Sequence, residues 1–189
     1  TFEIAEKSRR DRGKRHVLLL LPSLLFFMIV GSVKCQESFG SKPDLVFSNL
    51  YDFKILSADS IVSQEIGNQP DSALWNLLSA NVAWVEILAG NLENEYWNDE
   101  FTARIKKAKR NLKQNGLEDD DKLFYYIIVH AFMTRHELLG ENYLSAAADL
   151  NTCIDQISES FGREEKYEPF FLTSGLYYYF MAEAHEKYF

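Results

Sequence analysis

The chain has 189 residues, of which 47% are hydrophobic and 25% are charged. This balance is typical of a globular protein of one domain, and it excludes wholesale disorder, a collagen-like repeat and a small disulfide-stabilised scaffold. Residues 1–35 contain seven of the 20 basic side chains and three of the 28 acidic ones, which leaves a net charge of −12 on residues 36–189. Because so acidic a body repels phosphate backbones, we expect no nucleic acid as a partner.

The N-terminal segment, residues 1–35, predicts a secretory signal peptide. A basic run precedes an apolar run of 17 residues over positions 17–33, which is the order typical of export signals. Val33 and Cys35 are small enough for the two positions that a signal peptidase reads before its cut. We therefore expect cleavage before Gln36.

Two alternatives to cleavage stay open. The apolar run can remain as a single-span membrane anchor, although Pro22 shortens its uninterrupted part. Cys35 can carry a lipid, although Lys34 stands where a bacterial lipidation motif needs a small neutral residue. The chain contains no Asn-x-Ser/Thr sequon, which favours a bacterial export route. We expect a periplasmic or secreted protein, with a membrane-anchored form as the alternative.

After Gln36 the apolar residues recur at intervals of three and four, which predicts an all-α fold. Residues 36–44 predict a flexible linker, and residues 45–189 predict a repeat-like domain of about six helices. In chain order we expect helices over residues 45–66, 71–90, 99–114, 118–140, 143–161 and 169–189. After cleavage only Cys153 would remain, so packing and not a disulfide must stabilise this domain.

These boundaries follow from capping residues and helix breakers. They are Gly67, Pro70, Ser72, Gly140, Gly162 and Pro169. The first helix is expected to carry a stripe formed by Leu45, Asn49, Phe53, Leu56, Ser60 and Ser63. The third is expected to bury Phe101, Ile105, Ala108 and Leu112. The apolar run at 125–129 is also compatible with a buried strand, but the acidic start and the length of the segment favour a helix.

Residues 140–153 resemble the turn and second helix of a tetratricopeptide repeat. That family places an aromatic, a small, a bulky apolar and a second small residue at fixed spacing, and here these are Tyr143, Ala146, Leu150 and Cys153. The small residues let two antiparallel helices approach closely, while the bulky ones fill the groove between pairs. The resemblance implies antiparallel helical hairpins. A second, weaker match to the repeat pattern lies near Ala58, and its distance from the first match is not a multiple of the repeat length, so we expect an irregular solenoid. A plain helical bundle is the alternative.

No set of residues predicts a catalytic or metal site. The His-Glu pairs at 136–137 and 185–186 do not complete the H-E-x-x-H zinc motif. His130 and His136 are six residues apart and point to different faces of a helix, so they cannot bind one metal ion together. Because His130 lies in the most apolar segment, we expect it to be a hydrogen-bonded core residue. Cys153 lies on an apolar stripe of its helix, so we expect it to pack in the core. We expect no catalytic residue, no cofactor and no metal.

Two segments of opposite charge are neighbours in the sequence. The first turn of the fourth helix contains Asp119, Asp120 and Asp121. Negative side chains are stabilised at this positive end of the helix dipole, and we expect all three to be exposed. The third helix carries a basic cluster, formed by Lys106, Lys107, Lys109, Arg110 and Lys113. We expect this cluster to be a solvated face that pairs with the acidic residues 118–121, with partner binding as the alternative.

The sixth helix has more apolar residues than one neighbouring helix can bury. Within 12 positions it contains Phe170, Phe171, Leu172, Leu176, Tyr177, Tyr178, Tyr179, Phe180 and Met181. We predict either that the helix forms a homodimer or partner interface, or that the 189 residues are the N-terminal part of a longer helical protein.

The favoured function is an exported, non-catalytic helical-repeat scaffold that binds a protein or peptide partner in the cell envelope. One alternative is a helical accessory or sensory domain of a larger membrane-anchored envelope protein, and another is an enzyme of unrecognised type. Contact with the membrane is expected only through an uncleaved N-terminal segment.

Overall fold

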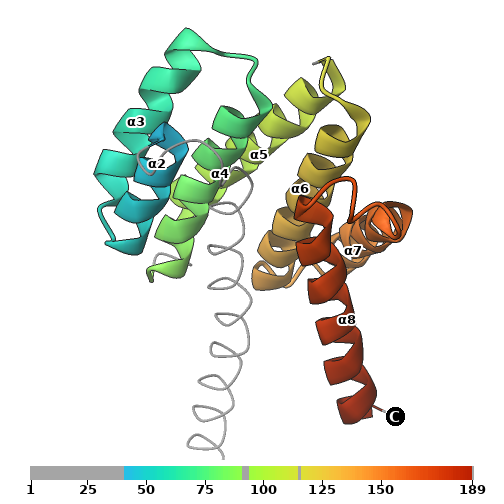
Figure 1. Cartoon of the computed structure of the whole chain (residues 1–189). Coiled ribbons are helices and arrows are strands. Elements are labelled where there is room, and N and C mark those ends of the chain that lie inside the picture. The colour runs from blue at the N-terminus through green and yellow to red at the C-terminus, as the bar shows by residue number, and fades with distance from the viewer. Residues whose placement is uncertain (1–40, 91–93, 115, 189) are drawn as a thin grey trace, which may run out of the picture.

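The computed structural model describes residues 41–90, 94–114 and 116–188, and in these residues the chain forms seven helices and no strand (Figure 1). The helices are α2 (Lys42–Tyr51), α3 (Ile55–Asn68), α4 (Ala73–Leu88), α5 (Glu95–Gln114), α6 (Asp119–Leu139), α7 (Tyr143–Ser160) and α8 (Pro169–Tyr188). The prediction of an all-α fold is confirmed. The predicted signal peptide and its cleavage site lie outside the described residues.

Five of the predicted helices match α4 to α8 within a few residues at each end. The apolar run at 125–129 lies inside α6, so it is helical and not a strand. α2 begins within the segment that was predicted as a linker. The reason is local, because the Ser41 side chain caps this helix by accepting a hydrogen bond of 3.4 Å from the backbone N–H of Asp44.

The prediction of a single first helix over residues 45–66 is wrong. The chain breaks between α2 and α3 at Phe53, whose φ of 54° lies in the left-handed region that no α-helix contains. As a result the expected stripe does not form a buried face, since Phe53 is 73% exposed and Leu56 is 82% exposed. The residues that α2 and α3 bury instead are Val46, Phe47, Leu50, Ala58, Val62 and Glu65. The break lets two short helices each turn an apolar face toward α4.

α4 is the helix that joins the two cores of the protein. One of its faces, including Trp75 and Val82, packs with α2 and α3 in the first core. The other face, including Leu77 and Trp84, packs in the second core with residues of α5 to α8. Because an α-helix repeats every 3.6 residues, these two sets lie on different sides of α4. The predicted N-cap is confirmed, since Ser72 accepts a hydrogen bond from the backbone N–H of Trp75.

A cluster of aromatic rings holds α4, α5 and α6 together. The ring of Phe101 on α5 lies 5.4 Å from Trp84 on α4 and 6.1 Å from Phe132 on α6, measured between centroids. The imidazole of His136 lies 4.7 Å from the same ring. The four residues predicted to be buried on α5, Phe101 among them, are all buried. The cluster therefore fixes the central part of the second core.

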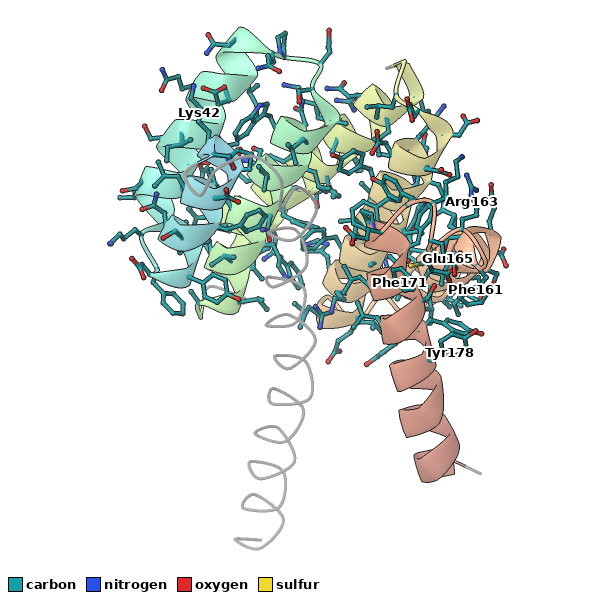
Figure 2. The ribbon with its side chains drawn as sticks, viewed as in Figure 1. Lys42, Phe161, Arg163, Glu165, Phe171 and Tyr178 are labelled. Atoms are coloured by element: carbon teal, nitrogen blue, oxygen red, sulfur yellow. The ribbon has the colours of Figure 1, made fainter. Side chains whose placement is uncertain are left out.

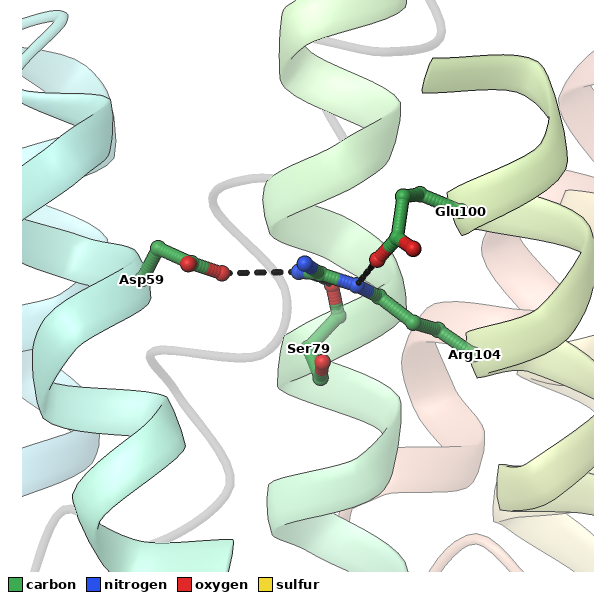
Figure 3. Close-up of polar contacts among 4 residues, drawn as sticks. All are labelled: Asp59, Ser79, Glu100 and Arg104. Carbon is green, nitrogen blue, oxygen red and sulfur yellow. Dashed lines mark hydrogen bonds and ion pairs between the residues drawn. The ribbon is translucent and has the colours of Figure 1, made fainter. Parts of the chain in front are cut away.

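Arg104 ties α5 to two further helices (Figure 3). Its Nη1 donates to the Oδ1 of Asp59 on α3 at 2.7 Å and to the backbone carbonyl of Ser79 on α4 at 3.2 Å. Its Nε donates to the Oε2 of Glu100, one turn earlier on α5, at 2.8 Å. These partly buried, charge-assisted hydrogen bonds fix the position of α5 against α3 and α4.

α6 and α7 form a helical hairpin, joined by a short turn in which Glu141 has a φ of 58°. On α7 the two small residues of the resemblance, Ala146 and Cys153, are both buried. The two bulky ones, Tyr143 and Leu150, are exposed. Small residues therefore lie where α7 meets α6, while the bulky residues face away from the hairpin.

α8 follows after a connection that folds back over the start of α6. Gly162 in this connection has a φ of 79°, which a residue with a side chain rarely adopts. Pro169 begins α8, as predicted, and Phe170 is fully buried beneath Tyr167 at a ring distance of 4.8 Å. From there α8 runs out beyond α6 and α7 (Figure 1).

Candidate functional site

His130 and Cys153 are both buried, as predicted. The Nδ1 of His130 lies 2.7 Å from the Oδ1 of Asp149 on α7. Burial lowers the pKa of His130 below its ordinary value of 6.5, and this effect outweighs the Asp149 carboxylate, which raises it. The ring is therefore neutral at pH 7, and because a carboxylate only accepts, Nδ1 carries the proton of this hydrogen bond.

The thiol of Cys153 is also held in the core. Its Sγ donates to the backbone carbonyl of Ile127 at 3.6 Å. Burial, helped by the charge of Asp149, raises the pKa of Cys153 to about 11. A thiol that stays protonated at neutral pH is a poor nucleophile and a poor metal ligand. Cys153 therefore contributes packing and not reactivity.

His136 points away from His130, as predicted from their spacing. Its Nε2 lies 3.1 Å from the Oδ1 of Asn98 on α5, whereas His130 faces α7. Among the residues that the structure describes, no three His, Cys, Asp or Glu side chains gather closely enough to hold a metal ion. His130, His136 and Cys153 thus serve the helix contacts.

The acidic run at the start of α6 does not behave as the sequence predicted. Asp120 is only 8% exposed, and its carboxylate pairs with Arg163 and with the Nζ of Lys166, the latter at 3.1 Å. Asp121 accepts a hydrogen bond of 2.6 Å from the hydroxyl of Tyr167. All three partners belong to the connection between α7 and α8. The expectation of an exposed acidic turn is therefore wrong for Asp120, because this connection folds over it.

Opposing effects act on the Asp120 carboxyl. Burial raises its pKa, but the hydrogen bond from Lys166 and the positive charge of Arg163 lower it by more, so the net pKa lies below 3.8. The carboxylate is therefore ionised at pH 7. It holds the α7–α8 connection against α6, and the ring of Phe170 lies 5.6 Å from the guanidinium carbon of Arg163.

The basic cluster of α5 does not pair with residues 118–121, contrary to the prediction. Within residues 41–90, 94–114 and 116–188, no ion pair joins its five side chains to another residue. Lys106, Arg110 and Lys113 are exposed, and Lys109 is half-buried. Asp120, which the sequence places next to this cluster, forms its ion pairs with Arg163 and Lys166 instead.

Aromatic side chains gather where α7 ends and α8 begins, as Figure 2 shows for the half-buried Phe161 and for Phe171 and Tyr178. Phe171 is 57% exposed and Tyr178 is 62% exposed. The ring of Phe161 stacks on that of Tyr178 at a centroid distance of 5.5 Å. Gly175 lies between Phe171 and Tyr178 on the same face of α8, because the three positions are four and three residues apart. We call Phe171, Gly175 and Tyr178 the α8 face.

Gly175 leaves a gap in the α8 face that nothing else in the described chain fills. Apart from the backbone of its own helix and its chain neighbours, a Cβ atom at this position would have no heavy atom within 4 Å. Glycine inside a helix is less favourable than alanine by about 1 kcal/mol. Internal packing therefore gives no reason for a glycine at this position.

An open cavity of about 460 Å³ lies at the start of α4, where Pro70, Ser72, Leu117 and Tyr125 line it. Burial, together with the charge of Asp121, raises the pKa of Tyr125 to about 12, so its hydroxyl stays protonated at neutral pH. The hydroxyl of Ser72 is used as the α4 cap. Neither hydroxyl is therefore activated as a nucleophile, and the lining also contains the carboxyl group of Asp71.

No protein family model, curated protein or solved structure matches this chain. None of the helices within the described ranges combines the length and the hydrophobicity needed to cross a membrane. The α8 face and the basic cluster of α5 are two of the exposed surfaces of the described fold.

Proposed function

We propose that the protein is an exported, non-catalytic helical scaffold that binds a partner protein in the cell envelope through the α8 face. The observation that carries this proposal is the pair of exposed rings, Phe171 and Tyr178, on either side of Gly175. Large exposed aromatics that lie together on one helix are typical of protein interfaces and uncommon elsewhere on a soluble surface.

The shape of the α8 face favours a helix as the occupant. A glycine between two bulky residues at helical spacing forms a hole, into which a side chain of a second helix can insert. The rings of Phe171 and Tyr178 would then cover the flanks of that helix. The cost of a glycine in α8 is explained if the partner fills the hole. We therefore propose that the α8 face binds a helix of a partner protein, and that this helix carries an apolar stripe.

The scaffold part of the proposal is supported by the order of the helices. Each helix from α3 to α7 packs against the next one in the chain, an order that fits an open row of hairpins (Figure 1). An open row leaves surface at its ends for a partner. Tyr143 and Leu150 on α7 are exposed where a further hairpin of a repeat array would cover them. A tetratricopeptide-like architecture is our proposal for this arrangement.

Export is proposed from the basic and apolar runs of residues 1–35. Mass spectrometry of the protein recovered from its own host is expected to show Gln36 as the first residue. Recovery of an intact apolar segment in the membrane fraction would contradict cleavage and support an anchor. A diacylglyceryl adduct on Cys35 would contradict it in favour of a lipoprotein.

The α8 face is tested by filling its hole. We expect full-length protein in its own host to capture one partner protein, and the Gly175→Leu variant to lose at least nine-tenths of that capture. The added side chain enters open space, so the variant should fold and melt no lower than the wild type. Gly67→Leu is the matched control, because Gly67 lies at the other end of the protein in α3 and also has no neighbour within 4 Å of its Cβ position.

Two results would contradict the proposal. Equal capture by wild type and Gly175→Leu would show that the partner binds elsewhere. If the only protein captured is a second copy of this chain, the α8 face forms a homodimer and does not bind a different partner protein. Gly67→Leu should capture the partner as well as the wild type does.

A further inference from the structure

We propose that α5 carries a second contact surface that binds an acidic segment of a protein. This surface, the basic stripe, consists of Lys106, Lys109, Arg110 and Lys113. It lies on a different helix from the α8 face, and it does not require that the α8 face be occupied.

Helical geometry brings the four cations of the basic stripe together. Their spacing of three, one and three residues keeps them within an arc of about 100° on α5, over about 10 Å of helix length. Ile105, Ala108 and Leu112, which lie beside or between them in the sequence, point to the core and are buried. The stripe is therefore a compact positive surface on residues 36–189, whose net charge is −12.

The fold does not neutralise the stripe. Arg104, Arg163 and Lys166 are paired with carboxylates, whereas no ion pair connects the four stripe cations with any residue of the described ranges. Lys106 and Arg110 are four residues apart, as are Lys109 and Lys113, and like charges at this spacing destabilise a helix. The negative end of the helix dipole compensates only a cation in the last turn, which is Lys113. Folding of this chain alone therefore gives no reason for three of the four charges.

Charge complementarity identifies the occupant as anionic, and the surroundings of the stripe favour a protein. Anionic membranes bind basic helices that also insert apolar side chains, but the large exposed apolar residue of α5, Tyr96, lies ten positions before Lys106. A nucleic acid duplex extends well past 10 Å and would meet the rest of a body with a charge of −12. A short protein segment with carboxylates at similar spacing fits the stripe without either conflict.

The test measures binding of a fluorescein-labelled octaglutamate peptide to the full-length protein by anisotropy at 50 mM salt. The double variant Lys106→Gln/Arg110→Gln is expected to bind the peptide at least tenfold more weakly than the wild type. The matched control is Lys54→Gln/Lys166→Gln, which removes the same charge from exposed lysines outside the stripe. This control is expected to bind within twofold of the wild type.

Three outcomes would overturn the proposal. They are no saturable binding of octaglutamate to the wild type, an equal loss in the control variant, and a larger loss in the double variant of binding to phosphatidylglycerol vesicles or to a DNA duplex than of binding to octaglutamate. The Gly175→Leu variant is expected to keep the octaglutamate affinity, since α8 does not contribute to the stripe. Failure of the α8 proposal and failure of this one are therefore separate results.

Discussion

Replacing Phe101 with alanine should lower the free energy of unfolding by about 3–5 kcal/mol, the usual cost of removing a fully buried ring. Phe101 is 1% exposed and lies against Trp84, Phe132 and His136. These neighbours belong to α4 and α6, which are held on both sides by further helices and cannot close the cavity. Urea denaturation of the full-length variant, followed by tryptophan fluorescence, measures the change.

Phe171→Ala is the matched control for Phe101→Ala, because it removes the same ring from a position that is 57% exposed. We expect this control to change the unfolding free energy by less than about 1 kcal/mol. A loss of less than about 1 kcal/mol for Phe101→Ala itself would show that the α4–α5–α6 cluster is not the centre of the second core.

Replacing Ala146 with leucine should destabilise the protein by about 1–3 kcal/mol, because extra carbon atoms in a close helix contact force the helices apart. Ala146 is 2% exposed and lies on the side of α7 that faces α6. Thermal unfolding monitored by circular dichroism is expected to show a lower midpoint. Ala147→Leu, at the neighbouring exposed position, is the control and should leave the midpoint nearly unchanged. Equal midpoints for both variants would contradict the close α6–α7 contact.

The sequence predicted α4 to α8 well because their ends depend on local chemistry. Ser72 caps α4 through its own side chain, Gly162 takes a left-handed conformation after α7, and Pro169 begins α8. Each of these effects involves residues within one turn of the helix end. The break at Phe53 was missed because residues 45–66 contain neither glycine nor proline, and phenylalanine rarely adopts a left-handed conformation.

The polar contacts were harder to predict because their partners are distant in the sequence. Arg163 is 43 residues from Asp120, and Arg104 is 45 residues from Asp59. Spacing along one helix indicates only pairs such as Glu100 and Arg104. The sequence therefore assigned Asp120 to the nearest basic helix, whereas the fold brings it to the α7–α8 connection.

The sequence shows that α8 has more aromatic residues than one neighbouring helix can bury, but it does not show which of them are buried and which are exposed. Phe170 is fully buried and its neighbour Phe171 is exposed, because adjacent helical positions point about 100° apart. Which of the two faces inward depends on where the α7–α8 connection places the start of α8. The role of Gly175 as a gap between rings likewise follows only from the exposed side of the folded helix.

The central claim, that a partner protein binds the α8 face, is tested most directly by site-specific photo-crosslinking in the native host. Benzoylphenylalanine replaces Phe171 or Tyr178 in the full-length protein, and the control position is Leu56, which is 82% exposed on α3 at the opposite end. We expect one adduct of the same defined mass from positions 171 and 178, with a partner that is not this chain, and no such adduct from position 56. The absence of an adduct from both α8 positions, or the same adduct from position 56, would contradict it.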